Sequence, residues 1–335
     1  MFLLTSMPRY KYVDMKILFI TSSRVGDAVL TTGLLKYLVD KYIHARFTVA
    51  CGPVACGLFE SVPRLDRIIP MRKGKMLEHW RFLLGATITQ HWYMVVDMRG
   101  SALAWCLPTM RRRIYRKIDK QMHRLSDMRH TLGLEKPADP YLWLSVKNEN
   151  FADRILGTND RRPILVVGPT ANWGAKIWPA RRFVKLIEQL TSNQGQLLNA
   201  RIAVVGGPGE EVLAAPILDS IPLDRKINLV GAIPFLDVAA VFKRANLYIG
   251  NDSGLMHLCA AMGTPTLGLF GPTREKNYHP WGETCGFVRS TETFDELSRK
   301  PDYKPDPTAT LMEGLSVEKV IKAVSELLKT RDVVN

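Results

Sequence analysis

Short apolar runs alternate with helical patterns along the first part of the chain. Residues 16–22, 46–51 and 92–98 are rich in β-branched and aromatic side chains, which predicts three buried strands. Residues 28–41 and 76–89 instead repeat apolar side chains at helical spacing. Because the strands are apolar almost throughout and alternate with helices, we predict a parallel sheet covered on both faces.

The same alternation restarts after residue 160. It predicts strands at residues 163–168, 201–206, 229–231, 247–250 and 266–270, and helices at 179–190, 209–220, 253–262 and 317–328. Residues 111–160 show no clear period, and the polar, proline-rich segment 292–308 predicts a loop. The last helix could pack on either half of the chain.

Length and element order together predict an α/β protein of two domains, since 335 residues exceed what one core usually organises. We assign residues 1–14 to an N-terminal extension, 15–155 and 160–315 to two Rossmann-like domains joined near 148–162, and 316–335 to a C-terminal helix. The apolar part of residues 1–14 is too short for a signal peptide, so the segment is either a genuine extension or a misassigned start. Ligands are expected in a cleft between the domains, at the carboxyl ends of the strands.

The charge of the chain indicates its kind of partner, and its cysteine content indicates its compartment. The chain has 46 Lys and Arg against 32 Asp and Glu, and this excess predicts a polyanionic partner: nucleic acid, an anionic membrane or a phosphorylated substrate. The five cysteines lack metal-binding spacing, so we expect reduced thiols in a cytoplasmic protein, with Cys106 and Cys259 buried. No apolar run reaches 18 residues, so no membrane-spanning helix is predicted.

A strand-to-helix turn, SSRVGDAVL at residues 22–30, holds the first candidate for chemistry. Asp27 lies where a helix N-cap is expected, and such a cap stabilises a helix by about 1 kcal/mol. The alternative is a carboxylate at the edge of the cleft, positioned to take a proton from an acceptor hydroxyl. Local spacing alone favours the cap.

Two loops of the second half predict anion binding. Residues 168–179, GPTANWGAKIWP, run from a strand through a glycine loop to Lys176, which suits a diphosphate although the P-loop pattern is absent. The alternative is a solvated Lys176 beside a packed Trp178. In residues 250–265, GNDSGLMHLCAAMGTP, a turn opens a helix whose N-terminus favours an anion. His257 would be a further donor there, or an ordinary buried histidine.

Two other interpretations of these loops are weaker. A serine hydrolase is disfavoured because the turn GNDSG lacks the G-x-S-x-G nucleophile elbow. The turn GGPGEE at residues 206–211 lacks the spacing of a dinucleotide fingerprint. Glu210 in that turn would bind a ribose hydroxyl or cap the following helix.

Taken in order, these segments resemble glycosyltransferase family 9, whose members include the ADP-heptose:lipopolysaccharide heptosyltransferases. The resemblance runs from about residue 16 to residue 281 and is most specific in DSGLMHLCAAMGTPTLGLFGP at residues 252–272, with SRVGD at 23–27 and KIWP at 176–179. It implies a GT-B fold, in which the N-terminal half takes the acceptor and the C-terminal half the nucleotide sugar. It also implies inverting transfer without a metal ion or other cofactor, and the sequence has no D-x-D motif.

The resemblance also assigns roles to individual residues. Asp27 becomes the general base, and Lys176 contacts the phosphates of a nucleotide sugar, with ADP-heptose as the expected donor. The other donor-binding residues are Thr170, Asn172, Glu210, Asp252, Ser253, Gly254, Leu255 and His257. Residues 170–173, TANW, depart from the hydroxyl-rich stretch that precedes this lysine in the family, so another nucleotide sugar stays an alternative.

A basic run at residues 111–129 carries eight Lys or Arg against two Asp. Either it is a solvated face, or it binds lipid phosphates or an acidic core sugar, which we favour because it lies in the acceptor half. The residues assigned to acceptor or membrane binding are Arg24, Arg111, Arg112, Arg113, Arg116, Lys117 and Lys120. Nucleic acid is disfavoured because no nucleic-acid-binding motif surrounds them.

The predicted function is transfer of a sugar, expected to be heptose, onto a phosphorylated, lipid A-linked lipopolysaccharide core acceptor. The enzyme would work in the cytoplasm, peripherally attached to the anionic inner face of a bacterial inner membrane. The alternatives are a GT-B sugar-nucleotide epimerase and a non-catalytic glycan- or membrane-binding protein on the same scaffold. A NAD-dependent oxidoreductase ranks lowest because its fingerprint is absent.

Overall fold

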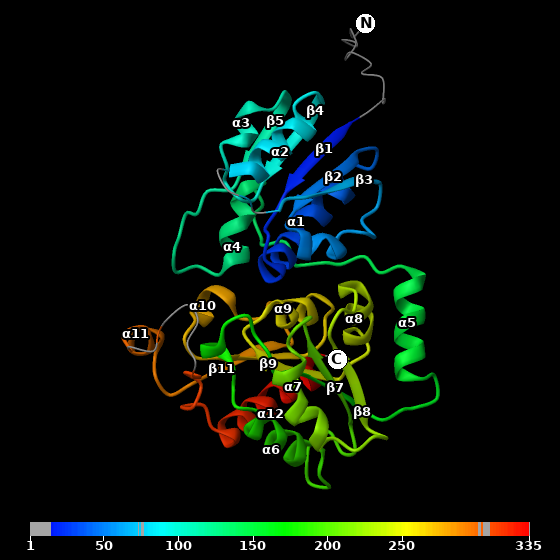
Figure 1. The fold of residues 1–335 in the computed structure, drawn as a ribbon, viewed down its shortest axis with the longest axis vertical. Coiled ribbons are helices and arrows are strands. Elements are labelled where there is room, and N and C mark those ends of the chain that lie inside the picture. Colours follow the sequence, from blue (N-terminus) through cyan, green and yellow to red (C-terminus); the bar gives the residue numbers. More distant parts are fainter. Residues whose placement is uncertain (1–14, 73, 75–76, 301–302, 304–308, 335) are drawn as a thin grey trace, which may run out of the picture.

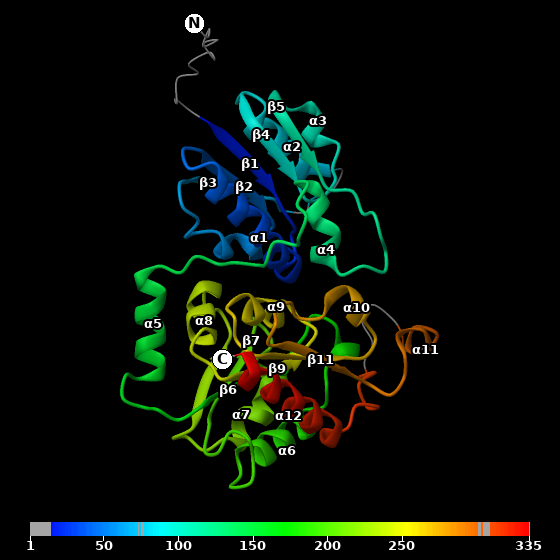
Figure 2. The same ribbon diagram turned by 180° about the vertical axis from the view of Figure 1, so that it is seen from behind.

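The computed structural model describes residues 15–72, 74, 77–300, 303 and 309–334, with side chains up to residue 329. These residues form two α/β halves, each built on a parallel sheet, and Figures 1 and 2 show one half above the other. The predicted α/β class with two parallel sheets is confirmed. Residues 1–14, predicted as an extension, lie outside the described residues.

The first sheet has the strand order β3-β2-β1-β4-β5 with parallel pairings. Its strands are β1 (Lys16–Ile20), β2 (Arg46–Cys51), β3 (Leu65–Pro70), β4 (Trp92–Asp97) and β5 (Thr109–Ile114). The connections contain α1 (Val25–Lys41), η1 (Pro53–Leu58), α2 (Glu78–Thr87) and α3 (Leu103–Cys106). The three predicted strands are confirmed. The apolar pattern missed β3 and β5, because edge strands keep one side in water and tolerate charged residues.

The second sheet has the order β11-β10-β9-β6-β7-β8 and is also parallel. Its strands are β6 (Ile164–Gly168), β7 (Arg201–Gly206), β8 (Lys226–Val230), β9 (Leu247–Asn251), β10 (Thr266–Phe270) and β11 (Cys285–Arg289). The helical segments are η4 (Gly174–Lys176), α6 (Ala180–Thr191), α7 (Glu211–Ser220), α8 (Phe235–Phe242), α9 (Gly254–Ala261), α10 (Glu275–Tyr278), α11 (Phe294–Ser298) and α12 (Val317–Val334). The strands and helices predicted here are confirmed to within a few residues, and β11, α8 and α10 were missed.

The predicted loop at residues 292–308 is wrong in part, because it contains α11. A capping box starts this helix: Thr293 Oγ1 accepts from Glu296 N at 3.2 Å, and Glu296 Oε2 accepts from Thr293 N at 2.7 Å. The box satisfies backbone groups that would otherwise stay unpaired in a helix of only five residues.

Residues 111–160, in which the sequence shows no clear apolar period, are also partly helical. They contain α4 (Arg124–Met128), η3 (Arg129–Thr131) and α5 (Val146–Leu156). Most of α5 lies within the predicted linker at 148–162 and inside the range 15–155, yet it packs on α8 of the second half. Asn148 Nδ2 donates to Asp237 Oδ1 at 2.7 Å, and Arg244 forms an ion pair with Glu149 at 2.9 Å. The last helix, α12, packs on α6, β10 and β11, which also belong to the second half.

Apolar packing joins the two halves through α1, α8 and α9. One continuous cluster of buried side chains includes Phe19 and Leu34 of the first half and Leu236 and Leu258 of the second. This contact brings the carboxyl ends of both sheets to the junction between the halves, where ligands of such folds bind. Within the described residues, no helix is long and apolar enough to cross a membrane.

Of the two cysteines predicted to be buried, one is buried and one is exposed. Cys51 and Cys259 are buried and carry free thiols. Cys106 was predicted to be buried but is exposed. The reason is that α3 is only four residues long and buries Leu103 and Ala104, so its last two side chains face outward.

Candidate active site

The N-termini of α1 and α9 meet at the junction of the two halves, and glycine makes their close approach possible. A Cβ added to Gly254 would lie 3.0 Å from Val25 Cβ and 3.1 Å from Gly26 N. A Cβ added to Gly26 would lie 3.1 Å from His257 Cδ2. Two of the predicted motifs, 220 or more residues apart, therefore touch through their backbones.

Asp27 lies in the first turn of α1 at this junction. The predicted N-cap role is wrong, because the helix starts three residues earlier than expected and Arg24 occupies the cap position without a side-chain cap. The Asp27 carboxylate forms no hydrogen bond or ion pair with a described residue. Burial raises the pKa of Tyr278, and the negative charge of Asp27 adds to that rise. The charge of this carboxylate is therefore felt by Tyr278 in the second half.

His257 lies at the centre of this arrangement and is buried. Burial lowers its pKa, and the charges of Asp252 and Asp27 act against that shift. The positive charges of Lys176 and His279 act in the same direction as burial. The imidazole is therefore neutral at pH 7, and one of its nitrogens donates while the other accepts.

Lys176 ends η4 and forms an ion pair with Asp252, with 2.8 Å between Nζ and Oδ2. Only 18% of the Lys176 side chain and 9% of the Asp252 side chain are exposed, so the alternative of a solvated lysine is wrong. Asn251 aligns the two loops: its Oδ1 accepts from Trp178 N at 3.1 Å and its Nδ2 donates to Pro169 O at 2.8 Å. Sequence reasoning did not single out Asn251.

The junction holds buried polar atoms that have no partner within the described residues. These atoms are Ser253 Oγ at the N-cap of α9, His257 Nδ1 and Thr273 Oγ1. The first turn of α9 adds backbone N–H groups that have no acceptor inside the helix. A buried donor without a partner is costly, so this set is suited to an anion with several oxygens, such as a diphosphate.

The neighbouring strand ends carry Thr170 and Glu210. Thr170 Oγ1 donates to Glu210 Oε2 at 2.6 Å, and Gly207 N donates to the same oxygen at 2.6 Å. Glu210 occupies the N-cap position of α7, but its side chain does not cap the helix, so that alternative is wrong. Asn172 is exposed on the loop before η4, and Trp173 packs edge-on against Tyr303.

The predicted basic run does not form one patch at the site. Arg112 is partly buried, and it donates to Ala104 O and Leu107 O, both at 2.8 Å. The side chains of Arg111, Arg113, Arg116, Lys117 and Lys120 are exposed along β5 and the loop that follows it. Arg24 is exposed beside the junction, at the N-cap of α1.

The loop after β5 is held by the second half. Asn277 Nδ2 donates to Lys120 O at 2.9 Å and to Met122 O at 2.8 Å. His123 Nε2 lies 3.1 Å from His279 O, and its ring packs at 4.5 Å from the ring of His279. No local pattern in the sequence indicates these contacts, which join residues more than 150 positions apart.

Comparison with known proteins places this geometry in a family. The model described as "Glycosyltransferase family 9 (heptosyltransferase)" matches residues 98–304, which is more than half of the chain. The chain belongs to glycosyltransferase family 9. It is therefore a glycosyltransferase, as the sequence resemblance predicted.

Relatives in sequence and in structure cover nearly the whole enzyme. It is 25% identical to lipooligosaccharide heptosyltransferase 2 of Haemophilus influenzae, over 94% of this chain and 99% of the relative. It is 24% identical to lipopolysaccharide heptosyltransferase 2 of Escherichia coli K12, with the same coverage. A family 9 glycosyltransferase from Veillonella parvula superposes with a TM-score of 0.76, at 20% identity over 94% of this chain and 97% of that one. E. coli ADP-heptose lps heptosyltransferase II superposes with a TM-score of 0.71, at 20% identity over 95% of this chain and 100% of that one. The predicted GT-B fold is confirmed.

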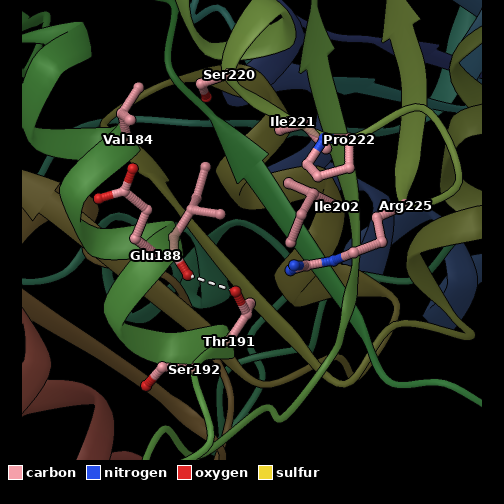
Figure 3. Close-up of a pocket in the computed structure, with 10 residues that line it drawn as sticks. Val184, Glu188, Thr191, Ser192, Ile202, Ser220, Ile221, Pro222 and Arg225 are labelled. Carbon is pink, nitrogen blue, oxygen red and sulfur yellow. Dashed lines mark hydrogen bonds between the residues drawn. The ribbon is translucent and has the colours of Figure 1, made fainter.

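A separate pocket of about 300 Å³ lies on the second half of this glycosyltransferase (Figure 3). It is lined by the C-terminal turns of α6 and α7, with Ile202 at the start of β7 and Arg225 just before β8. These positions belong to the amino ends of the strands, whereas the junction lies at their carboxyl ends. The pocket is thus not part of the site. Among the described residues, no three His, Cys, Asp or Glu side chains gather as metal ligands would.

Replacing Gly254 with alanine is expected to lower kcat about tenfold while both halves stay folded. The new Cβ would press on Val25 and on the backbone of Gly26, which moves α9 away from α1 by a few tenths of an ångström. Steady-state kinetics and thermal unfolding would be measured on the variant and on Gly85→Ala. Gly85 is a helical glycine at which an added Cβ would meet no other atom within 4 Å. Equal kcat in both variants would contradict the expectation.

The contact at His123 is expected to weaken in acid. Burial, together with the charge of His279, lowers the pKa of His123 from 6.5 to about 4. Because the folded pKa lies below the unfolded one, the stabilisation is complete above pH 6.5 and is lost as pH falls toward 4. The shift corresponds to about 3 kcal/mol. Thermal unfolding between pH 7.5 and pH 4.5 should therefore depend less on pH in His123→Gln than in the wild type, and identical slopes would contradict this account.

Proposed function

We propose that this protein transfers a heptosyl group from ADP-heptose onto a lipid A-linked lipopolysaccharide core acceptor. Support comes from relatives that cover almost the whole chain and are named lipopolysaccharide or lipooligosaccharide heptosyltransferase 2. Two solved neighbours of the same fold are E. coli heptosyltransferase WaaC with ADP and with ADP-2-deoxy-2-fluoro heptose. Thr170, Asn172, Glu210 and Leu255 complete the donor site in this proposal.

The observation that carries the proposal is the set of buried, unpartnered donors at the N-terminus of α9. The donor diphosphate would lie against Ser253, His257 and the free N–H groups of the first turn. Lys176 lies beside these donors and forms an ion pair with Asp252. As the sugar leaves, negative charge grows on the diphosphate, and these fixed groups stabilise it.

Asp27 faces this site from the other half and would act as the general base. It takes the proton of the acceptor hydroxyl while that oxygen bonds to the anomeric carbon from the side opposite the diphosphate. The bond between the anomeric carbon and the diphosphate oxygen breaks, and ADP leaves with the electron pair. One in-line displacement inverts the anomeric configuration. The proposal requires no metal ion or other cofactor, because Lys176 and α9 supply the positive charge.

The enzyme would act in the cytoplasm, at the anionic inner face of the inner membrane, where a lipid-linked acceptor is held. The exposed cations Arg24, Arg113, Arg116 and Lys117 would attract the phosphates of the acceptor or of the bilayer. Nucleic acid has no part in the proposal.

The test is a transfer assay with ADP-heptose and a deacylated, water-soluble core acceptor, with and without EDTA. Release of ADP together with a heptosylated acceptor of inverted anomeric configuration by NMR supports the proposal. Loss of activity in EDTA would overturn the metal-free mechanism. An altered nucleotide sugar without acceptor modification would indicate an epimerase instead, and failure to bind ADP in calorimetric titration would remove the donor site.

A further inference from the structure

Exposed residues of α3, β5 and the loop after β5 line the outer edge of the first sheet. We name this surface the β5 edge stripe. It consists of Trp105, Met110, Arg111, Arg113, Arg116, Lys117 and Ile118, all of them exposed; within β5, Met110 lies on one face of the edge strand and Arg111 and Arg113 lie on the other. In Figure 1, α3 and β5 lie side by side at the outer edge of the first half.

The stripe combines large apolar side chains with a net positive charge. Trp105 is 61% exposed, Met110 69% and Ile118 65%. Residues 98–118 contain six Lys or Arg and no Asp or Glu. Within the described part of the chain, no ion pair involves any of the four exposed cations of the stripe. The next acidic residues along the chain are Asp119 and Asp127, and Asp127 Oδ1 accepts from Ile118 N at 2.9 Å, so the surface keeps a net positive charge.

The fold holds the apolar part of the stripe in place. Arg112 donates to Ala104 O and Leu107 O at 2.8 Å, which ties α3 to β5, and its guanidinium lies 5.8 Å from the centre of the Trp105 ring. Arg111 points to the other side of the strand, where it lies over the ring of Tyr93. These contacts hold Trp105 at the surface, although exposing its side chain to water is unfavourable.

The positive charge of the stripe favours one kind of partner. β5 is the last strand of its sheet, and an unpaired edge invites a further strand. A second copy is disfavoured, because pairing two β5 edges would bring the arginine clusters together. An anionic lipid surface complements the cations and accepts Trp and Met side chains at the headgroup level.

We propose that the β5 edge stripe docks this enzyme on an anionic bilayer, with Trp105 and Met110 inserted between the headgroups. The inference deepens the proposed function and rests on it, since a lipid-linked acceptor would be reached from the same membrane. The stripe also leads toward the active site. The loop beyond Lys117 continues to Lys120 and Met122, whose carbonyls Asn277 holds at the junction.

Vesicle binding tests the proposal without relying on activity. The full-length protein is floated with vesicles of phosphatidylcholine containing about one third phosphatidylglycerol, and with pure phosphatidylcholine, at low salt. The wild type is expected to bind the anionic vesicles only. Trp105→Ser with Met110→Ser, and separately Arg116→Glu with Lys117→Glu, should each lower the partition coefficient at least about tenfold.

Matched controls are taken from the second half. Val212→Ser with Leu223→Ser removes apolar side chains that are even more exposed than those of the stripe, and Lys147→Glu with Lys319→Glu makes the same charge change elsewhere. Both controls should bind like the wild type. Brominated lipids should quench tryptophan fluorescence in the wild type and less in Trp105→Phe, which reports insertion of that ring.

The outcomes separate the two proposals. If the wild type does not bind anionic vesicles, or if the stripe variants bind them as well as the controls do, the docking inference is overturned. Transfer to a water-soluble acceptor would then still stand. If nucleic acid or an acidic protein, but not lipid, binds the stripe, the inference is also overturned. Vesicle binding with no heptosyl transfer would instead overturn the proposed function and leave the docking surface intact.

Discussion

The Asp27→Asn variant is expected to lose about 10²- to 10⁴-fold in kcat while its affinity for ADP stays close to that of the wild type. Asparagine keeps the size of the side chain but cannot take the proton of the acceptor hydroxyl. Since the Asp27 carboxylate has no partner among the described residues, its removal breaks no contact of the fold. Pre-steady-state kinetics with saturating donor and acceptor would measure the chemical step.

A matched control for this variant lies in the same helix. Asp40→Asn in α1 removes a carboxylate that pairs with Lys36 on the surface, far from the junction. It should change neither kcat nor ADP binding. Activity of Asp27→Asn within a factor of a few of the wild type would remove Asp27 from the role of general base. A fall in ADP affinity equal to the fall in kcat would indicate a donor-side role instead.

The Lys176→Ala variant is expected to weaken ADP binding by about tenfold or more and to lower kcat by roughly 10²–10³. The lysine supplies the cation nearest to the departing diphosphate, and α9 alone must then stabilise the developing charge. Truncation also leaves Asp252 buried without its counter-ion, so the folded state should lose stability by about 2 kcal/mol, less than for a fully buried pair. Calorimetric titration with ADP and thermal unfolding measure the two effects.

Lys185→Ala is the control for this effect on stability. Lys185 in α6 pairs with Glu318 at 3.0 Å on the surface, where such pairs contribute little. The control should bind ADP normally and unfold at the wild-type temperature. Lys176→Met with Asp252→Asn removes both charges and should recover stability without recovering kcat. Recovery of both would show that Lys176 acts on the fold alone.

The apolar patterns of β1, β2, β6, β7 and β10 predicted these strands nearly to the residue, because strands buried on both faces of a parallel sheet are apolar throughout. The role of the loops that follow these strands was also predictable, because Lys176, Ser253 and His257 lie where a strand meets a helix N-terminus. The family and the fold were therefore predictable from the sequence, and so were most of the candidate site residues, with Asn251 and Thr273 as exceptions.

Edge strands and capped segments were less predictable. β5 reads as a basic run because three of its six residues are arginine. Only its hydrogen bonds to β4 show that it is a strand. Similarly, α5 follows no clear apolar period, and its capping box and its contacts with α8 decide that it is helical. Tertiary partners override weak local preference in both cases.

The order of residues alone specifies the local elements and the chemistry that each loop carries. Tertiary packing sets which of these loops meet. It brought Gly26 against Gly254, paired Lys176 with Asp252 across 76 positions, and let Asn277 hold the basic loop. Periodicity reports only which face of an element is buried, whereas these contacts depend on how two separately folded sheets pack against each other. The same packing left Asp27 without a partner among the described residues and Trp105 exposed to water, and these two features carry the proposals for catalysis and for membrane docking.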